Sequence, residues 1–284
     1  MKIRSQEIFD LDIKVIPLSE GLGAEISGVD VSAPISAEVL KCIKQAWFEW
    51  GVILFRKQLL TVVSQTKFAE YFGELQKVRT VADAHPHPAV MMVTNVKNES
   101  MKAILPEGEM QFHSDQCYYE RPAAGTMLYA IEVPPIGGDT LFSDCRAAYS
   151  VLEPAVRTKC ENERALFVYD YGNNPTSKDS VSGSAAPRYA HPVFRTHPET
   201  GRKSVYVNRL MTDHIIGKSE KESRKLLEAL YVVQESSRFI YRHKWQVGDV
   251  ILWDNRCVLH ARTDFDPKSR RMLQRVTIAG DRPY

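Results

Sequence analysis

The sequence contains few cysteines, and no pair of them suggests a metal or redox site. The five cysteines are Cys42, Cys117, Cys145, Cys160 and Cys257, and none belongs to a Cys-x-x-Cys motif. Their odd number and their spacing argue against a zinc ribbon and a thioredoxin-type centre. Unpaired thiols are typical of a reducing compartment, so we expect a cytoplasmic protein.

Long apolar runs and an excess of one charge are absent as well. No stretch is long and apolar enough to predict a membrane-spanning helix, and the charged residues spread over positions 1–17 argue against a signal peptide. The net charge of +2 gives no reason to expect nucleic acid or an acidic membrane surface as a partner. With 44% hydrophobic and 25% charged residues, the composition is that of an ordinary globular protein.

The chain also lacks internal repeats and any linker that would divide it. We therefore expect one domain over residues 1–284, a length that β-barrels and sandwiches can reach as a single unit. Residues 173–187 are rich in Ser, Asn, Gly and Pro, which predicts a loop. This loop is either a lid over a site or a surface excursion.

The first third of the sequence predicts a mixture of strands and helices. Two short strands are expected over 15–18 and 24–26, and a buried strand over 52–55. Apolar residues at helical spacing predict a helix over 37–50, with Ser36 as its N-cap and Gly51 at its end. A second helix is predicted over 61–72, capped by Thr61.

The rest of the sequence is richer in short strands. They are predicted over 90–94, 126–133, 165–170, 193–196, 204–208, 239–242, 250–253 and 271–278, with helices over 143–152 and 220–234. A turn at 198–201 predicts a hairpin between two of these strands. Many short strands with flanking helices favour a mostly β fold, a barrel or jelly roll, over a parallel α/β sheet.

One short motif has the chemistry of a metal site. In His113-Ser114-Asp115 the imidazole and the carboxylate would face the same side of a strand. A late histidine, His260, could complete a face of two histidines and one carboxylate, which suits non-haem Fe(II). Zinc hydrolases use similar ligands, so the set alone leaves the reaction open. His197, in His197-Pro198-Glu199, is assigned to the hairpin turn instead.

Two arginines narrow the choice of reaction. Arg271 and Arg275 lie four residues apart in a strand-like stretch, on the same face as Leu273. An arginine that points into a barrel needs an anion, and a guanidinium can bind a carboxylate through two hydrogen bonds. A dicarboxylate that chelates iron at one end would place its other carboxylate within reach of such a residue.

Together these features resemble the TauD/TfdA family of Fe(II)- and 2-oxoglutarate-dependent dioxygenases. The resemblance covers nearly the whole chain, and its most specific stretches are residues 112–115, 134–140, 248–260 and 270–277. It implies a double-stranded β-helix, or jelly roll, with helices outside. It also implies O2-dependent hydroxylation of a small anionic organic substrate, with or without subsequent cleavage of a C–O, C–N or C–S bond, and release of succinate and CO2.

The resemblance assigns roles residue by residue. His113, Asp115 and His260 would bind Fe(II) and form the catalytic centre, and Thr140 and Arg271 would hold the distal carboxylate of 2-oxoglutarate. Arg275 would contact an anionic group of the substrate or the cosubstrate, and the presence of Asp115 argues against halogenation. Trp253 and Asn255 are expected to pack near the iron strand. The candidates for the substrate pocket wall are Phe112, Tyr118, Tyr119, Tyr206 and His85.

Some positions depart from the family pattern, and other functions stay open. The taurine enzyme has an asparagine four residues before the first ligand, where this chain has Glu109, so a sulfonate is disfavoured. One alternative is a jelly roll that binds a metal or 2-oxoglutarate without turnover, and another is a metal-dependent hydrolase. A third is hydroxylation of a cationic betaine-type substrate, which Arg275 would repel. The expected partners are a small organic acid and further copies of the chain in a homo-oligomer.

Overall fold

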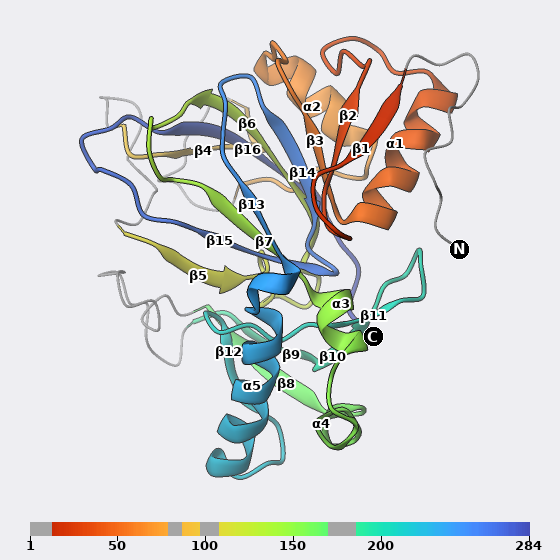
Figure 1. The fold of residues 1–284 in the computed structure, drawn as a ribbon, viewed down its shortest axis with the longest axis vertical. Helices are drawn as coiled ribbons and strands as arrows, with labels where there is room; N and C mark the ends of the chain where they lie inside the picture. Colours follow the sequence, from red (N-terminus) through yellow and green to blue (C-terminus); the bar gives the residue numbers. More distant parts are fainter. Residues whose placement is uncertain (1–12, 79–86, 97–107, 170–185) are drawn as a thin grey trace.

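The computed structural model describes residues 13–78, 87–96, 108–169 and 186–284, and its architecture is mostly β. Figure 1 shows an upper body made of two sheets, two helices on the outside of this body, and a smaller lobe below it. No helix in these four ranges is long and apolar enough to cross a bilayer.

The larger sheet of the upper body has seven strands, in the order β1-β2-β3-β14-β6-β16-β4. All neighbours are antiparallel except β2 and β3. The strands are β1 (Lys14–Pro17), β2 (Ala24–Ser27), β3 (Val52–Phe55), β14 (Val250–Asp254), β6 (Ala123–Glu132), β16 (Met272–Ala279) and β4 (Val90–Thr94). The last strand of the chain, β16, therefore lies inside this sheet, between β6 and β4.

The second sheet has four strands and faces the first. Its order is β13-β7-β15-β5, with β13 (Ile240–His243), β7 (Thr140–Asp144), β15 (Val258–Arg262) and β5 (Met110–His113). A core cluster joins Leu128, Trp253 and Leu273 of the first sheet to Phe142 and Val258 of the second. Two mostly antiparallel sheets packed in this way form a jelly roll, as expected from the sequence.

Two helices cover the outer face of the larger sheet. Helix α1 (Ala37–Trp50) begins at Ser36, whose side chain accepts a hydrogen bond from Val39 N, and ends at Gly51 with φ 68°. Helix α2 (Val62–Glu70) begins with a capping box at Thr61. Their apolar side chains pack against the outward residues of β6, β14 and β16. The side chains on the other face of the same strands point into the space between the two sheets.

The lower lobe follows β7 in the chain. It contains a sheet of β12 (Thr212–Ile215), β8 (Arg164–Val168) and β9 (Arg188–Pro192), and the hairpin of β10 (Phe194–Thr196) and β11 (Lys203–Val205). The lobe also contains helices α3 (Cys145–Ser150), α4 (Pro154–Cys160) and α5 (Glu220–Gln234) and the short 3-10 helix η3 (Ser237–Phe239). Helix α5 packs into the core of the lower lobe through Leu226, Leu227 and Leu230.

Most predicted elements are confirmed, and a few boundaries are wrong. The helix predicted over 143–152 begins later, because Ser143 and Asp144 still belong to β7 and the Asp144 side chain caps α3. Helix α4 was not expected. Asp115 lies in a turn beyond β5 and not on a strand, so alternation does not explain how it faces the same point as His113. The predicted loop at 173–187 lies almost entirely outside the described residues.

Candidate metal and cosubstrate site

The structure brings the three predicted metal ligands together between the two sheets. His113, at the end of β5, is the cross-strand partner of His260 on β15, and their ring centroids lie 4.1 Å apart. The chain then turns through Gln116, whose φ is 59°, and this turn carries Asp115. One donor atom from each of the three side chains lies within 4.8 Å of the others.

The protonation of this group suits a divalent metal. Burial lowers the pKa of His113 and brings that of His260 to about 3, so both imidazoles are neutral at neutral pH. His113 Nδ1 donates to the carbonyl of Gln111 at 2.9 Å, which leaves Nε2 with a free lone pair. His260 Nδ1 is buried and has no hydrogen-bond partner in the described part of the chain. A metal ion would satisfy these nitrogens.

Asp115 is held in its ionised form by its neighbours. Burial by itself would raise its pKa, but the charge of Arg275 and the hydrogen bond from Thr126 hold the pKa below its usual range. Arg275 Nη2 lies 2.9 Å from Oδ1, and the Thr126 hydroxyl donates to Oδ2 at 2.6 Å. The three ligand candidates therefore offer two neutral nitrogens and one carboxylate, a set that fits non-haem Fe(II).

Arg271 lies buried next to a tight turn of glycines. Its side chain is only 2% exposed, and Nε donates to the carbonyl of Gly138 at 3.3 Å. Its backbone N–H donates to Asn95 Oδ1 at 2.9 Å, which fixes the start of β16. Within residues 13–78, 87–96, 108–169 and 186–284, its Nη1 has no hydrogen-bond partner.

The surroundings of Arg271 favour the binding of an anion. Burial, and then the charge of Arg262, lower the pKa of Arg271 to about 9, and both guanidinium groups lie about 6 Å from the Phe265 ring, at 6.0 Å for Arg271 and 5.7 Å for Arg262. Thr140 Oγ1 accepts a hydrogen bond from Trp245 Nε1 at 3.0 Å, so its own hydroxyl proton can be donated elsewhere. A carboxylate would satisfy the buried Nη1 of Arg271.

The aromatic candidates for a pocket wall are placed less favourably. Phe112 neighbours His113 on β5, and alternation turns its side chain to the opposite face of the strand. Tyr118 packs between Tyr119 and Tyr169, with its ring tilted against both and its centroid 4.7 Å from each of theirs. Tyr206 is 2% exposed and packs in the core of the lower lobe. His85 lies outside the described residues.

Several residues at this site carry no signal in the sequence. Thr126, on β6, touches Asp115, but no motif surrounds it. Asn255 was expected to pack, and its amide instead hydrogen bonds to Thr126 and to the backbone of Asp115. Arg262 lies two residues after His260 on β15, so the two side chains share one face of the strand. Each of these contacts depends on strand register, and the only available clue was the WDNR stretch at 253–256.

A second group of potential ligands, His197, Asp254 and Cys257, is a structural cluster. The backbone N–H groups of Glu199 and Thr200 donate to His197 Nδ1, so Nε2 carries the proton and donates to Asp254 Oδ2 at 2.9 Å. The Arg256 guanidinium bonds to both oxygens of Asp254. Since no lone pair of His197 is left for a metal, this histidine anchors the β10–β11 hairpin, as predicted.

Comparisons with known proteins agree with this geometry. The family model "Taurine catabolism dioxygenase TauD, TfdA family" matches residues 14–277. The chain is 32% identical over 277 residues to an (S)-phenoxypropionate/alpha-ketoglutarate-dioxygenase of Sphingobium herbicidovorans, covering 94% of this chain and 95% of the relative.

A second relative is an alpha-ketoglutarate-dependent 2,4-dichlorophenoxyacetate dioxygenase of Cupriavidus pinatubonensis. It is 31% identical over 282 residues, covering 93% of this chain and 97% of the relative. Among solved structures, a putative alpha-ketoglutarate-dependent taurine dioxygenase from Burkholderia xenovorans superimposes with a TM-score of 0.81 at 32% identity, covering 95% of this chain and 94% of the other. The chain thus belongs to the TauD/TfdA family of 2-oxoglutarate-dependent dioxygenases.

Proposed function

We propose that this enzyme uses Fe(II), 2-oxoglutarate and O2 to hydroxylate a small organic acid. The observation that carries the proposal is the convergence of His113, Asp115 and His260 within 4.8 Å. Bound Fe(II) and 2-oxoglutarate would together activate O2, so that a C–H bond of the substrate is hydroxylated while 2-oxoglutarate becomes succinate and CO2. A protein that only binds 2-oxoglutarate is not favoured, because the relatives are named as dioxygenases.

In this proposal each side of the site has its own task. His113, Asp115 and His260 would hold Fe(II), which would supply the activation of O2 once 2-oxoglutarate is bound. Thr140 and Arg271 bind the distal carboxylate of 2-oxoglutarate, through one hydroxyl and one guanidinium. Because Arg271 is buried, the hydrogen bonds to this carboxylate form away from water, where they are strongest.

Arg275 is the proposed anchor for the substrate. Its side chain is 20% exposed and lies beside Asp115, so it can meet a bound acid next to the metal. The two relatives named above act on phenoxypropionate and 2,4-dichlorophenoxyacetate, which are carboxylates with an ether oxygen on the adjacent carbon. We propose a carboxylate of this kind for the present enzyme. Hydroxylation of that carbon gives a product that breaks its C–O bond and releases a phenol or alcohol.

The wider setting of the enzyme also remains a proposal. The whole chain, residues 1–284, is proposed to act as one catalytic domain, in the cytoplasm and as a homo-oligomer. Tyr118 and Phe112 are retained as candidate substrate contacts, although alternation along β5 counts against Phe112.

An anaerobic titration with Fe(II) and 2-oxoglutarate, followed by measurements of O2 consumption, tests the proposed function. The substrate panel should contain phenoxyacetate, 2-phenoxypropionate, taurine and a quaternary ammonium betaine. The expected result is strong stimulation by the aryloxy acids, with one succinate formed for each phenol released. Stimulation by the betaine alone would contradict the role of Arg275, and turnover without O2 would contradict the reaction class.

A further inference from the structure

We infer that Trp253, Asn255 and Thr126 form a one-way chain of hydrogen bonds that positions Asp115 for metal binding. Trp253 Nε1 donates to Asn255 Oδ1 at 2.9 Å, Asn255 Nδ2 donates to Thr126 Oγ1 at 2.9 Å, and Thr126 Oγ1 donates to Asp115 Oδ2 at 2.6 Å. The inference rests on the metal site proposed above and names three further residues that serve it.

The direction of the chain follows from its chemistry. Indole N–H and backbone N–H groups can only donate, and both Trp253 Nε1 and the backbone N of Asp115 point at Asn255 Oδ1. A flipped Asn255 amide would set its NH2 group against these two donors, so Nδ2 must face Thr126. The hydroxyl of Thr126 then uses a lone pair for Asn255 and gives its proton to Asp115.

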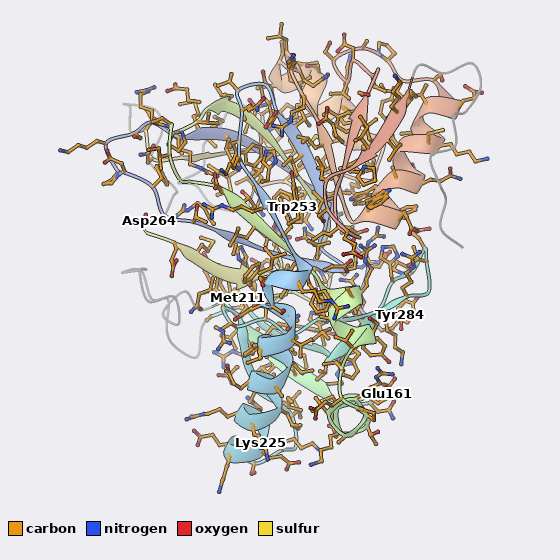
Figure 2. The ribbon with its side chains drawn as sticks, in the orientation of Figure 1. Glu161, Met211, Lys225, Trp253, Asp264 and Tyr284 are labelled. Atoms are coloured by element: carbon orange, nitrogen blue, oxygen red, sulfur yellow. The ribbon has the colours of Figure 1, made fainter. Side chains whose placement is uncertain are left out.

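The strand register places the members of this chain on one face. Thr126 on β6 and Trp253 on β14 are direct cross-strand partners, so both side chains point into the space between the two sheets. Figure 2 labels Trp253 in the middle of the upper body. The exposed fractions of Trp253, Asn255 and Thr126 are 1%, 1% and 0%, so water does not compete for these hydrogen bonds.

Asn255 also holds the turn that carries Asp115. Its Oδ1 accepts from Asp115 N at 3.3 Å, and its backbone carbonyl accepts from Ser114 Oγ at 3.0 Å. Ser114 and Asp115 both precede Gln116, which adopts a left-handed conformation that non-glycine residues rarely use. Asn255 thus stabilises the turn through the backbone and orients the carboxylate through the side chain.

The chain has a consequence for the coordination of the metal. Since the Thr126 hydroxyl donates to Oδ2 and Arg275 Nη2 lies 2.9 Å from Oδ1, the Asp115 carboxylate has one fixed orientation in which it would be offered to the metal. The ring centroid of Trp253 also lies 4.6 Å from that of His260, so Trp253 packs directly against another candidate ligand. Groups that orient metal ligands in this way commonly contribute 10- to 100-fold to metal affinity.

Fe(II) affinity measured under anaerobic conditions by calorimetry tests this inference. Thr126→Val keeps the shape of the side chain and removes its hydroxyl, and we expect it to weaken binding by about 10- to 100-fold. Thr126→Ser keeps the hydroxyl and should restore affinity close to that of the wild type. Trp253→Phe removes only the first donor, so a smaller loss is expected.

Ser223→Ala provides the matched control. Ser223 is also a buried hydroxyl, 2% exposed, and it accepts from Ile215 N in the lower lobe. It should leave Fe(II) affinity unchanged. The inference about the hydrogen-bond chain would be overturned if Thr126→Val bound Fe(II) as tightly as the wild type. It would also be overturned if Thr126→Ser or Ser223→Ala lost as much Fe(II) affinity as Thr126→Val. Failure of the wild-type protein to bind Fe(II) would overturn the metal site itself.

Discussion

Arg275 Nη2 lies 2.9 Å from Asp115 Oδ1, so the proposed substrate anchor directly contacts a candidate metal ligand. We expect Arg275→Gln to raise the KM for an anionic substrate by about 10- to 100-fold, since a charge-assisted hydrogen bond contributes about 1.5–3 kcal/mol. Steady-state O2 consumption with an aryloxy acid measures this change.

Arg270→Gln is the control for Arg275. Arg270 is a nearby arginine with a 60% exposed side chain that pairs with Glu132 on the surface. Its substitution should leave the KM unchanged. Equal KM values for the wild type and Arg275→Gln would show that Arg275 does not bind substrate.

Removal of a proposed metal ligand should abolish turnover. His113→Ala and Asp115→Ala each leave only two of the three donor groups. We expect no succinate above background when either variant is incubated with Fe(II), 2-oxoglutarate, O2 and substrate. His214→Ala should retain activity, because His214 pairs with Asp213 on the surface. Succinate formation by either ligand variant would contradict the assignment.

Arg271→Ala should separate cosubstrate binding from metal binding. The loss of two charge-assisted hydrogen bonds, each on the order of 1.5–3 kcal/mol, predicts a rise of at least about 100-fold in the KM for 2-oxoglutarate. Fe(II) affinity should stay near the wild-type value, because Arg271 contacts none of the three ligands among its described hydrogen bonds. Parallel loss of both would mean that Arg271 is structural.

Gly138 offers a test of the same subsite through sterics alone. A Cβ at Gly138 would lie 3.2 Å from Arg271 Nε and 2.9 Å from Pro134 Cγ. Gly138→Ala should therefore displace the guanidinium and raise the KM for 2-oxoglutarate. Gly201→Ala is the matched control, because Gly201 has a similar φ of 67° but nothing within 4 Å of the new methyl group. Both variants share the backbone strain of about 1–2 kcal/mol, so only their difference reports on Arg271.

His191 should contribute to loss of stability in acid. Burial lowers its pKa to about 4 in the folded protein, against an ordinary value of about 6.5 in the unfolded chain. The unfolded state therefore binds a proton first as the pH falls, and the free energy of unfolding decreases between about pH 6.5 and pH 4. Above this window the full contribution of His191 to the free energy of unfolding is present. Its loss on acidification is on the order of 3 kcal/mol at most.

Urea unfolding at pH 7 and at pH 5 checks this prediction. His191→Gln retains an N–H group for the carbonyl of Tyr119, which His191 Nε2 contacts at 2.9 Å. The drop in unfolding free energy between the two pH values should be smaller in the variant. An unchanged drop would assign the acid sensitivity to other groups.

The sequence was informative where local patterns decide structure. Helix α1 could be predicted with both ends, because its apolar spacing, the cap at Ser36 and the stop at Gly51 are all local. The candidate ligands His113 and Asp115 could be named from their His-x-Asp motif, and His260 was assigned by the resemblance to the family. The turn at Asp115 could not be predicted, because a left-handed Gln116 has no signature comparable to glycine.

The hydrogen bonds of Thr126 and Asn255 at the site could not be predicted from the sequence for a different reason. Thr126 and Asn255 are 129 positions apart, and only the register of β6 against β14 brings them together. Likewise the contacts of Arg271 depend on the turn at Gly138 and on Asn95, which follows β4. No pattern within a window of a few residues reports such contacts.

The place of β16 in the larger sheet bears on how the enzyme is made. This C-terminal strand inserts between β6 and β4, both of which leave the ribosome much earlier. Until β16 is made, β4 has no neighbour in this sheet, and both Arg271 and Arg275 are missing from the site. In the order of synthesis the candidate ligands His113, Asp115 and His260 therefore precede both arginines, so the proposed anion-binding groups are added after the candidate metal ligands.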